Sequence, residues 1–143
     1  MKPLRVAYVL GLHPAAAAFA HGAPSVEVLT SGVCGCRGGW IAHMRENGFR
    51  VTTHDVADVA AERRKLDMPD RLGSCHSAEV GGYLIEVHVL AADIRRLLKE
   101  SVKAIRLAVP GIVPGVPGMT GPKTAYETLL VSRSGTTRVF ASH

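Results

Sequence analysis

The amino-acid sequence predicts an α/β (α+β) fold in which helices flank a mixed sheet. Segments with the apolar spacing of helices alternate with short β-branched or apolar runs, in the order β-α-β-α-β-β-α. A proline- and glycine-rich loop and an extra C-terminal β-hairpin follow this pattern. At 143 residues and 47% hydrophobic content, the chain is long enough for one domain with its own core. We therefore expect a single folded domain without internal repeats.

The first half of this domain reads as two strand–helix units. They are a strand over 24–31, a helix over 38–47, a strand over 49–56 and a helix over 56–67. Trp40, Ile41 and Met44 fall on one face of the first helix. The second strand is rich in β-branched residues, which favour extended structure. Asp55 offers an N-cap for the second helix, and Pro69 is expected to end it.

The second half predicts a hairpin, a helix, an irregular loop and a further hairpin. They span, in order, 77–89, 91–100, 110–122 and 125–142. Gly81-Gly82 is a strong signal for a two-residue turn between strands. Ile94 and Leu97 continue the helical spacing that starts at Leu90. The loop holds four prolines and four glycines, which exclude a regular element. A long loop of this kind inside a compact domain is usually functional or disordered.

The formal net charge of +5 raises the question of nucleic-acid binding. However, the basic residues in "RENGFR", "ERRK" and "DIRRLLK" alternate with acids at helical spacing. This pattern is typical of solvated helix faces rather than of a phosphate-binding track. No stretch approaches the roughly 20 apolar residues that a membrane-spanning helix needs. We therefore expect neither a nucleic-acid partner nor a membrane span.

Residues 1–20 have the layout of a secretory signal peptide. Lys2 and Arg5 precede an apolar stretch, which ends in the small-residue triplet Ala18-Phe19-Ala20. The first acidic residue of the chain is Glu27. Cleavage after Ala20 would leave residues 21–143 as a single mature domain outside the cytoplasm. The alternative is an N-terminal tail on a cytosolic protein.

Three cysteines carry the chemical signal of this sequence: Cys34, Cys36 and Cys75. An odd number does not make a disulfide framework, and a bridge between Cys34 and Cys36 would be strained. Both lie between a strand and the start of a helix, whose N-terminus favours a thiolate over a thiol. Arg37 adds a positive charge beside them. A thiolate pair of this kind suits the soft ion Cu(I) better than zinc.

Cys75 lies far from this pair in the sequence, but the element order predicts that it is close in space. In a β-α-β-α-β-β-α arrangement, the loop entering the third strand lies beside the first strand–helix junction. The stretch "GSCHS" falls in that loop, so we expect Cys75 to complete a site of three sulfurs. The alternative is a buried, inert thiol that acts as a small hydrophobic side chain.

Several stretches resemble the successive motifs of the CopG-type periplasmic copper-resistance proteins. They are "VCGCRGGWIAHMRENGF", "LGSCHSAEVGGYLIEVHV", "ADIRRLL", "LAVPGIVPGVPGM" and "TTRVFAS". The resemblance covers nearly all of the mature chain, in the same order and with similar spacing. It implies a thioredoxin-like fold, export to the periplasm, and binding of copper through thiolates. It also implies a role in interconverting Cu(I) and Cu(II).

The motif of this family is Cys-x-Cys-Cys, followed by a Cys-His pair before the third strand. Cys34 and Cys36 match its first two positions, and Cys75-His76 match the later pair, whereas Arg37 replaces the third cysteine. This replacement favours a site with one or a few copper ions over a multinuclear cluster.

Two candidate ligands are weaker than the three cysteines. In an extended segment, His76 would point to the face opposite Cys75. The family commonly has methionine where Ile112 stands in the loop, but Met119 is retained. Met119 is a soft thioether that either closes over the metal site or packs on the core as a plug.

The leading hypothesis is a periplasmic copper-binding protein that serves copper resistance or handling. Its partners would be copper ions and other periplasmic copper-handling proteins. This makes the chain a metal-binding protein first, with copper redox activity as an addition. The alternatives are a thiol-disulfide oxidoreductase on a thioredoxin-like scaffold, and a family member that has kept only a partner-binding surface.

Overall fold

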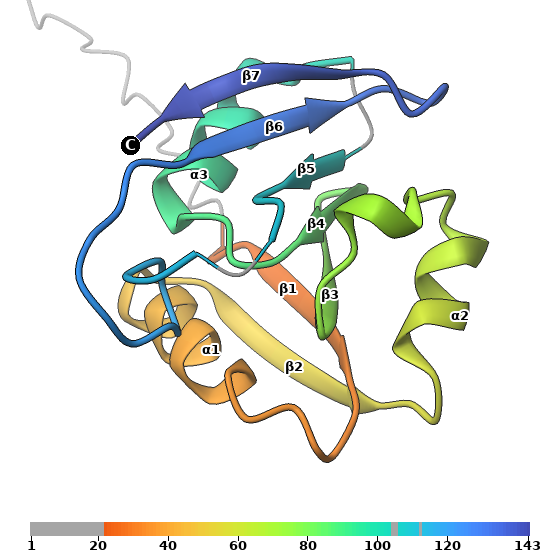
Figure 1. Cartoon of the computed structure of the whole chain (residues 1–143), viewed down its shortest axis with the longest axis vertical. Coiled ribbons are helices and arrows are strands. Elements are labelled where there is room, and N and C mark those ends of the chain that lie inside the picture. Colours follow the sequence, from red (N-terminus) through yellow and green to blue (C-terminus); the bar gives the residue numbers. More distant parts are fainter. Residues whose placement is uncertain (1–21, 104–105, 112) are drawn as a thin grey trace, which may run out of the picture.

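The computed structural model describes residues 22–103, 106–111 and 113–143 (Figure 1). These residues form a sheet of seven strands, three α-helices and one 3-10 turn. In chain order the elements are β1 (Ser25–Thr30), α1 (Arg37–Glu46), β2 (Arg50–Asp55), α2 (Val59–Lys65), η1 (Asp70–Leu72), β3 (His76–Val80), β4 (Tyr83–Glu86), α3 (Ala91–Glu100), β5 (Arg106–Ala108), β6 (Glu127–Val131) and β7 (Thr137–Ser142). The expected signal peptide, residues 1–20, lies outside the described residues, as does Ile112.

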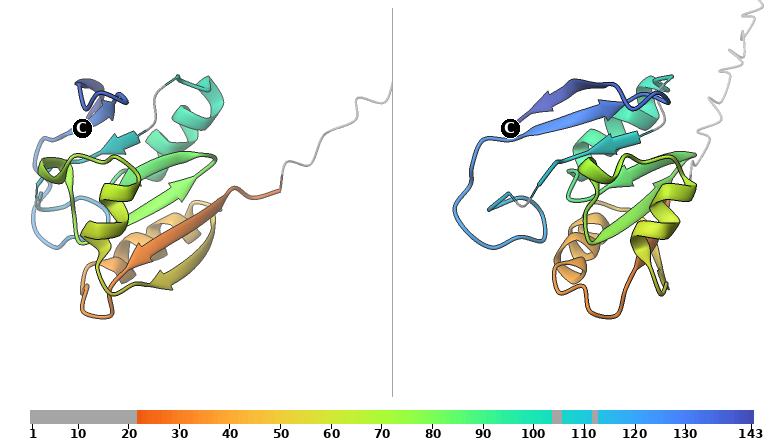
Figure 2. Two further views of the ribbon diagram at one scale, coloured as in Figure 1. Left: turned by 90° about the vertical axis from the view of Figure 1, so that its right-hand side faces the viewer. Right: turned by 45° about the vertical axis from the view of Figure 1, so that its right-hand side comes forward.

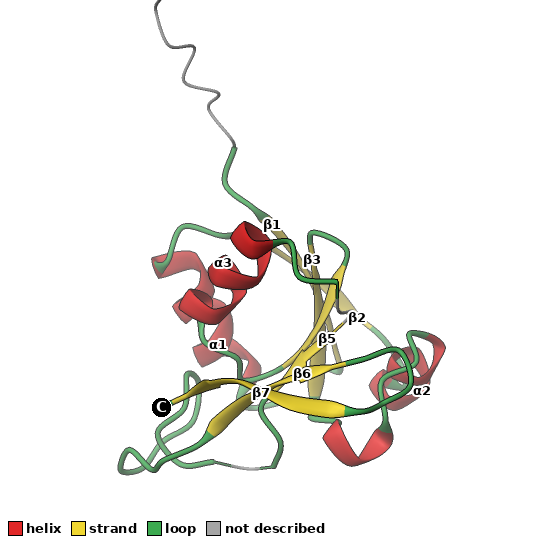
Figure 3. Cartoon of the chain, turned by 90° about the horizontal axis from the view of Figure 1, so that it is seen from above, coloured by secondary structure: helices red, strands yellow, loops and turns green. Residues whose placement is uncertain are grey.

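The sheet is mixed, as the sequence predicts, and its strand order is β2-β1-β3-β4-β5-β6-β7. The pairs β1–β2 and β4–β5 are parallel, and the other neighbours are antiparallel. The sheet twists strongly from β2 to β7 (Figure 2). Helices α1 and α3 lie on one face and α2 on the other (Figure 3). The thioredoxin-like character that the family resemblance implies stays a prediction.

The main hydrophobic core fills the space between the sheet and the helices α1 and α3. Trp40 and Met44 of α1 and Ile94 and Leu97 of α3 are fully buried in it. A smaller cluster forms a second core: Met68, Leu72, Leu84, Ala108 and Val131. Burial of these side chains is the main favourable term that holds the helices against the sheet. In the part of the chain that the structure describes, no helix is both long and apolar enough to cross a membrane.

The start of α2 differs from the sequence prediction. Asp58, not Asp55, caps this helix, because its carboxylate accepts a hydrogen bond of 2.9 Å from the backbone N–H of Ala61. Asp55 is instead the last residue of β2. The helix ends at Lys65, before Pro69, which directly precedes the 3-10 turn. Because β2 extends to Asp55, the helix begins later than expected and Asp58 takes the cap position.

Two strands also differ from the prediction. The strand expected over 83–89 ends at Glu86, and β5 has no counterpart in the prediction. β5 has only three residues, too few to show a period in the sequence, but all three are buried. Arg106 is among them, and its guanidinium donates hydrogen bonds to the backbone carbonyls of Leu66 and Ser132. The parallel pairing of β5 with β4 joins the C-terminal hairpin to the rest of the sheet.

The proline- and glycine-rich loop is irregular, as expected, and it packs against the start of α1 (Figure 1). A Cβ atom added at Gly39 would lie 2.7 Å from the Cα atom of Gly118. Gly118 has a positive φ of 87°, and a Cβ there would lie 2.7 Å from the backbone N of Trp40. The backbones of the loop and the helix therefore touch at a point where neither can carry a side chain.

This contact predicts opposite effects for two neighbouring glycines in α1. Gly38→Ala should stabilise the fold by up to about 1 kcal/mol, because alanine favours helix and its Cβ would meet nothing within 4 Å. Gly39→Ala should instead destabilise it by about 1–3 kcal/mol, because the new methyl group overlaps the backbone of Gly118. Chemical denaturation of both variants measures the difference. Equal stabilities would show that the loop is not seated on α1.

Candidate metal centre

The pairing of β1 with β3 brings the two cysteine-bearing segments together. Thr30, at the end of β1, is the partner of His76, at the start of β3, in an antiparallel ladder. The chain that leaves β1 carries Cys34 and then Cys36, which directly precedes α1. The chain that enters β3 carries Cys75. The expectation that "GSCHS" lies beside the first strand–helix junction is therefore confirmed in the geometry.

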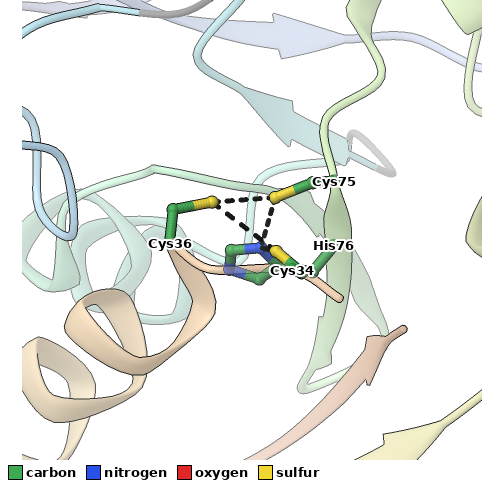
Figure 4. A group of neighbouring side chains, drawn as sticks. All are labelled: Cys34, Cys36, Cys75 and His76. Carbon is green, nitrogen blue, oxygen red and sulfur yellow. Dashed lines mark hydrogen bonds between the residues drawn. The ribbon is translucent and has the colours of Figure 1, made fainter. Parts of the chain in front are cut away.

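The three sulfurs and one imidazole nitrogen form a compact group, in which all four atoms lie within 4.8 Å of one another (Figure 4). The Sγ atom of Cys36 lies 3.5 Å from that of Cys34 and 2.8 Å from that of Cys75. The Nδ1 atom of His76 lies 3.4 Å from Cys34 Sγ and 3.2 Å from Cys75 Sγ. The expectation that His76 points away from Cys75 is therefore wrong. Its ring turns toward the sulfurs from the first position of β3.

The group has a closed side and an open side. Cys34 and His76 are buried, Cys36 is half-buried and Cys75 is exposed. A cavity of about 390 Å³ opens over the exposed side, where it is lined by Cys36, by Cys75 and its two preceding residues, by His88, and by Gly111 and Met119 of the proline- and glycine-rich loop. A small ion can therefore reach the sulfurs from solvent without displacing the core.

The three thiols differ in how readily they lose a proton. Burial raises the pKa of Cys34, but hydrogen bonds from the other two thiols and from the backbone outweigh it, so that this pKa lies below its ordinary value. Burial raises the pKa of Cys36 and of Cys75, and the charge of the neighbouring Cys34 adds to the increase. In the absence of metal, Cys34 is therefore the first of the three thiols to lose its proton as the pH rises.

His76 is held as a neutral imidazole. Burial first, and then the positive charges of His88 and Arg37, lower the pKa of His76 to about 3. The rings of Trp40 and His88 meet it edge-on, with centroid distances of 5.7 Å and 5.5 Å. A neutral imidazole with a free lone pair is the form that binds metal ions.

Met119 and His88 lie near this group but not in it. Both line the cavity above Cys36 and Cys75. Met119 is half-buried and also packs against the main core, so its position fits both of the roles that the sequence left open. The Nδ1 atom of His88 donates a hydrogen bond of 2.6 Å to the carbonyl of Pro117, which joins the floor of the cavity to the loop.

Arg37, which occupies the third cysteine position of the family motif, turns toward β2. Its Nη1 atom forms an ion pair of 2.9 Å with Asp55 and donates a hydrogen bond of 3.2 Å to the carbonyl of Ser31. Part of its positive charge is thus neutralised away from the sulfurs. At this position the site carries a cation instead of a fourth thiol.

Sequence reasoning missed two charged residues behind the cysteines. Arg63 lies in "ERRK", for which the sequence predicts a solvated helix face, yet it is buried. Glu86 is fully buried at the end of β4. Burial raises its pKa to about 7, although hydrogen bonds from Ser77 and Ser74 and the positive charge of Arg63 act in the opposite direction. The sequence does contain a signal for this pair, which is the glutamate inside the mainly apolar stretch "YLIEVHV". A strand buried on both faces rarely holds a charge without a partner, so Glu86 predicts a buried cation nearby.

The sheet and the cluster together define a small α/β protein with a cysteine-rich metal-binding cluster. A family model described as a protein of unknown function, DUF411, matches residues 72–119. No curated protein matches the chain. A solved structure named copper resistance protein CopG, form 2, is 38% identical, with a TM-score of 0.79, and the alignment covers 85% of this chain and 98% of that one. Form 1 is 39% identical, with a TM-score of 0.77 and coverages of 83% and 96%.

The sequence identity and the coverage of both chains, and not the shared fold alone, show to which family this chain belongs. The chain belongs to the family of the copper resistance protein CopG.

The low pKa of His76 predicts how stability depends on pH in the metal-free protein. Below the ordinary histidine pKa of 6.5 the unfolded chain binds a proton at this residue, whereas the folded chain binds it only near pH 3. The unfolded state then holds more protons, so the free energy of unfolding falls as the pH falls. The expected loss from His76 is about 2–3 kcal/mol between pH 6.5 and about pH 4.5.

Urea denaturation at a series of pH values measures this loss, with His76→Gln as the comparison. The low pKa of His43 and of His88 contributes in both proteins, so the difference between the two curves isolates His76. Parallel curves would mean that His76 is protonated alike in the folded and unfolded chains.

Proposed function

We propose that this protein binds Cu(I) through the thiolates of Cys34, Cys36 and Cys75 and serves copper resistance or copper handling. The observation that carries the proposal is the convergence of three sulfurs and the Nδ1 atom of His76 within 4.8 Å. Thiolates are soft donors that suit the soft ion Cu(I). The name of the solved relatives, copper resistance protein, supports the choice of copper.

In this proposal the cysteines hold the ion, and His76 and Met119 are the supplementary donors. His76 presents a neutral ring from the buried side, and Met119 offers a thioether at the wall of the cavity. Copper ions are the cargo of this protein. Its protein partners would be other copper-handling proteins of the same compartment. Because Arg37 stands in place of a further thiol, we propose a site for one or a few ions.

Copper redox chemistry is the second part of the proposal. Thiolates favour Cu(I), whereas imidazole is also a good ligand for Cu(II), so the donor set supports interconversion between the two states.

A thiol-disulfide oxidoreductase is the alternative function. It is favoured by the contact of 2.8 Å between the sulfurs of Cys36 and Cys75. Thiol titration of protein purified without copper separates the two, because the alternative requires a disulfide that exchanges with dithiols in the absence of metal.

We also propose that residues 1–20 are a signal peptide and that residues 21–143 are the mature, periplasmic domain. The proposal rests on the basic, apolar and small-residue order of the first 20 residues. The resemblance of the sequence motifs to the CopG-type copper-resistance proteins implies the same compartment.

The decisive experiment compares Cys75→Ser with Met119→Leu. Serine is nearly isosteric with cysteine but a poor ligand for so soft an ion, so Cys75→Ser should weaken Cu(I) binding by more than about 100-fold. Met119→Leu keeps the apolar volume and should cost less. Competition with a chromophoric Cu(I) chelator measures both affinities, and circular dichroism verifies that both variants are folded. If Cys75→Ser binds Cu(I) as tightly as the parent, the site is no more than the local pair Cys34 and Cys36.

The compartment is tested by expressing the full chain and isolating the mature protein. N-terminal sequencing should begin at His21, since cleavage is expected after Ala20. A mature cytoplasmic protein that begins at Met1 would contradict the periplasmic assignment.

A further inference from the structure

A buried ion pair lies directly behind the segment that carries Cys75 and His76. The Nη1 atom of Arg63, on α2, lies 3.1 Å from the Oε1 atom of Glu86, at the end of β4. The side chains are 8% and 0% exposed. Burying two charges is costly unless further hydrogen bonds satisfy them, and such a pair is weak evidence for stability alone. The hydrogen bonds that this ion pair makes with its neighbours therefore indicate its structural role.

The pair holds both polar backbone groups of Ser74. The N–H of Ser74 donates a hydrogen bond of 2.5 Å to Glu86 Oε1, and its carbonyl accepts one of 2.7 Å from Arg63 Nη1. The second carboxylate oxygen of Glu86 accepts a hydrogen bond of 2.6 Å from the hydroxyl of Ser77. Ser74 directly precedes Cys75, and Ser77 directly follows His76. One ion pair thus binds the chain on both sides of the Cys75-His76 dipeptide.

Gly73 shows that this arrangement is close-packed. A Cβ atom at residue 73 would overlap the guanidinium group of Arg63. The guanidinium therefore lies directly against the backbone that leads into Ser74. Any larger residue at this position would push Arg63 away from the carbonyl that it binds.

Cys75 needs such a restraint more than the other cluster residues do. It is exposed and lies outside β3, between the 3-10 turn and the first strand residue. His76, in contrast, is fixed by its ladder partner Thr30 and by the aromatic rings around it. Cys34 and Cys36 belong to a different segment, which neither Arg63 nor Glu86 contacts through a hydrogen bond among the described residues.

We propose that Arg63, Glu86 and Ser77 form a positioning clamp that holds the Sγ atom of Cys75 against the other two sulfurs. They are positioning residues, since none of them is a metal ligand in the proposed site. Loss of the clamp should leave Cys34 and Cys36 in place and free Cys75 to move toward solvent. The consequence for copper binding rests on the proposed function, but the consequence for the distance between sulfurs does not.

Two variants remove or weaken the clamp without leaving an isolated buried charge. Arg63→Met/Glu86→Leu replaces both partners by apolar side chains, a change that buried ion pairs often tolerate. Ser77→Ala is the milder variant and removes one hydrogen bond to Glu86. Thr128→Val is the matched control for Ser77→Ala. It removes a buried hydroxyl that donates a hydrogen bond of 2.6 Å to Asp93 and that forms no hydrogen bond with residues 73–77.

The first experiment needs no metal. In a Cys34→Ser background, Cys36 and Cys75 are the only thiols. Treatment of this copper-free protein with diamide should form a Cys36–Cys75 cross-link rapidly, because the two sulfurs are already in contact. The clamp variants should form it about tenfold more slowly or worse, since even a displacement of about 1 Å slows reactions between positioned groups strongly. Thr128→Val should react like the parent. Clamp variants that cross-link at the parent's rate would overturn the proposal.

The second experiment is a double-mutant cycle for Cu(I) affinity. The clamp variants should lose about 10- to 100-fold in affinity, the range typical of groups that orient metal ligands. In a Cys75→Ser background the same changes should have no further effect, because the clamp acts only through Cys75. An equal loss in both backgrounds would show that the ion pair serves only the fold, and would overturn the proposal. If the parent binds no Cu(I), the proposed function fails, and the cross-linking rates alone decide on the clamp.

Discussion

The antiparallel pairing of β1 with β3 brings the two halves of the cluster together, because the register that joins Thr30 to His76 places the end of one strand opposite the start of the other. Side chains alternate between the two faces of a strand, so a slip of one residue would turn His76 away from the sulfurs and move Cys75 along the sheet. The buried faces of both strands, with Val26, Val28 and Ala78 in the main core, make such a slip costly. The core therefore determines the geometry of a site that lies at its edge.

The cluster combines two environments that favour different parts of the proposed chemistry. Cys34 and His76 lie on the dry side, where burial keeps the imidazole neutral and neighbouring hydrogen bonds favour a thiolate. Cys75 faces the cavity, where an ion or a partner's ligand can approach. An ion entering from solvent would meet the exposed sulfur first and the buried donors last. Such a gradient suits a protein that must both retain an ion and release it to another carrier.

The sequence predicts the cluster better than it predicts what supports it. The position of Cys75 follows from element order, which short-range patterns reveal. The cap at Asp58 depends on where β2 ends, and the burial of Arg63 and Glu86 depends on how α2 packs against the sheet, which no local pattern contains. The orientation of His76 is likewise a matter of tertiary packing, because neighbouring rings and sulfurs override the simple alternation of an extended strand.

The position of Trp40 gives this protein an optical property. It is the only tryptophan of the chain, and its indole ring meets His76 edge-on inside the core, with its Nε1–H bonded to the carbonyl of Val89. An indole that is fixed and shielded from water emits from a single environment, and a redox-active ion close by provides a path for its excited state to decay. The fluorescence of the chain should therefore respond to events among the sulfurs, without any added label.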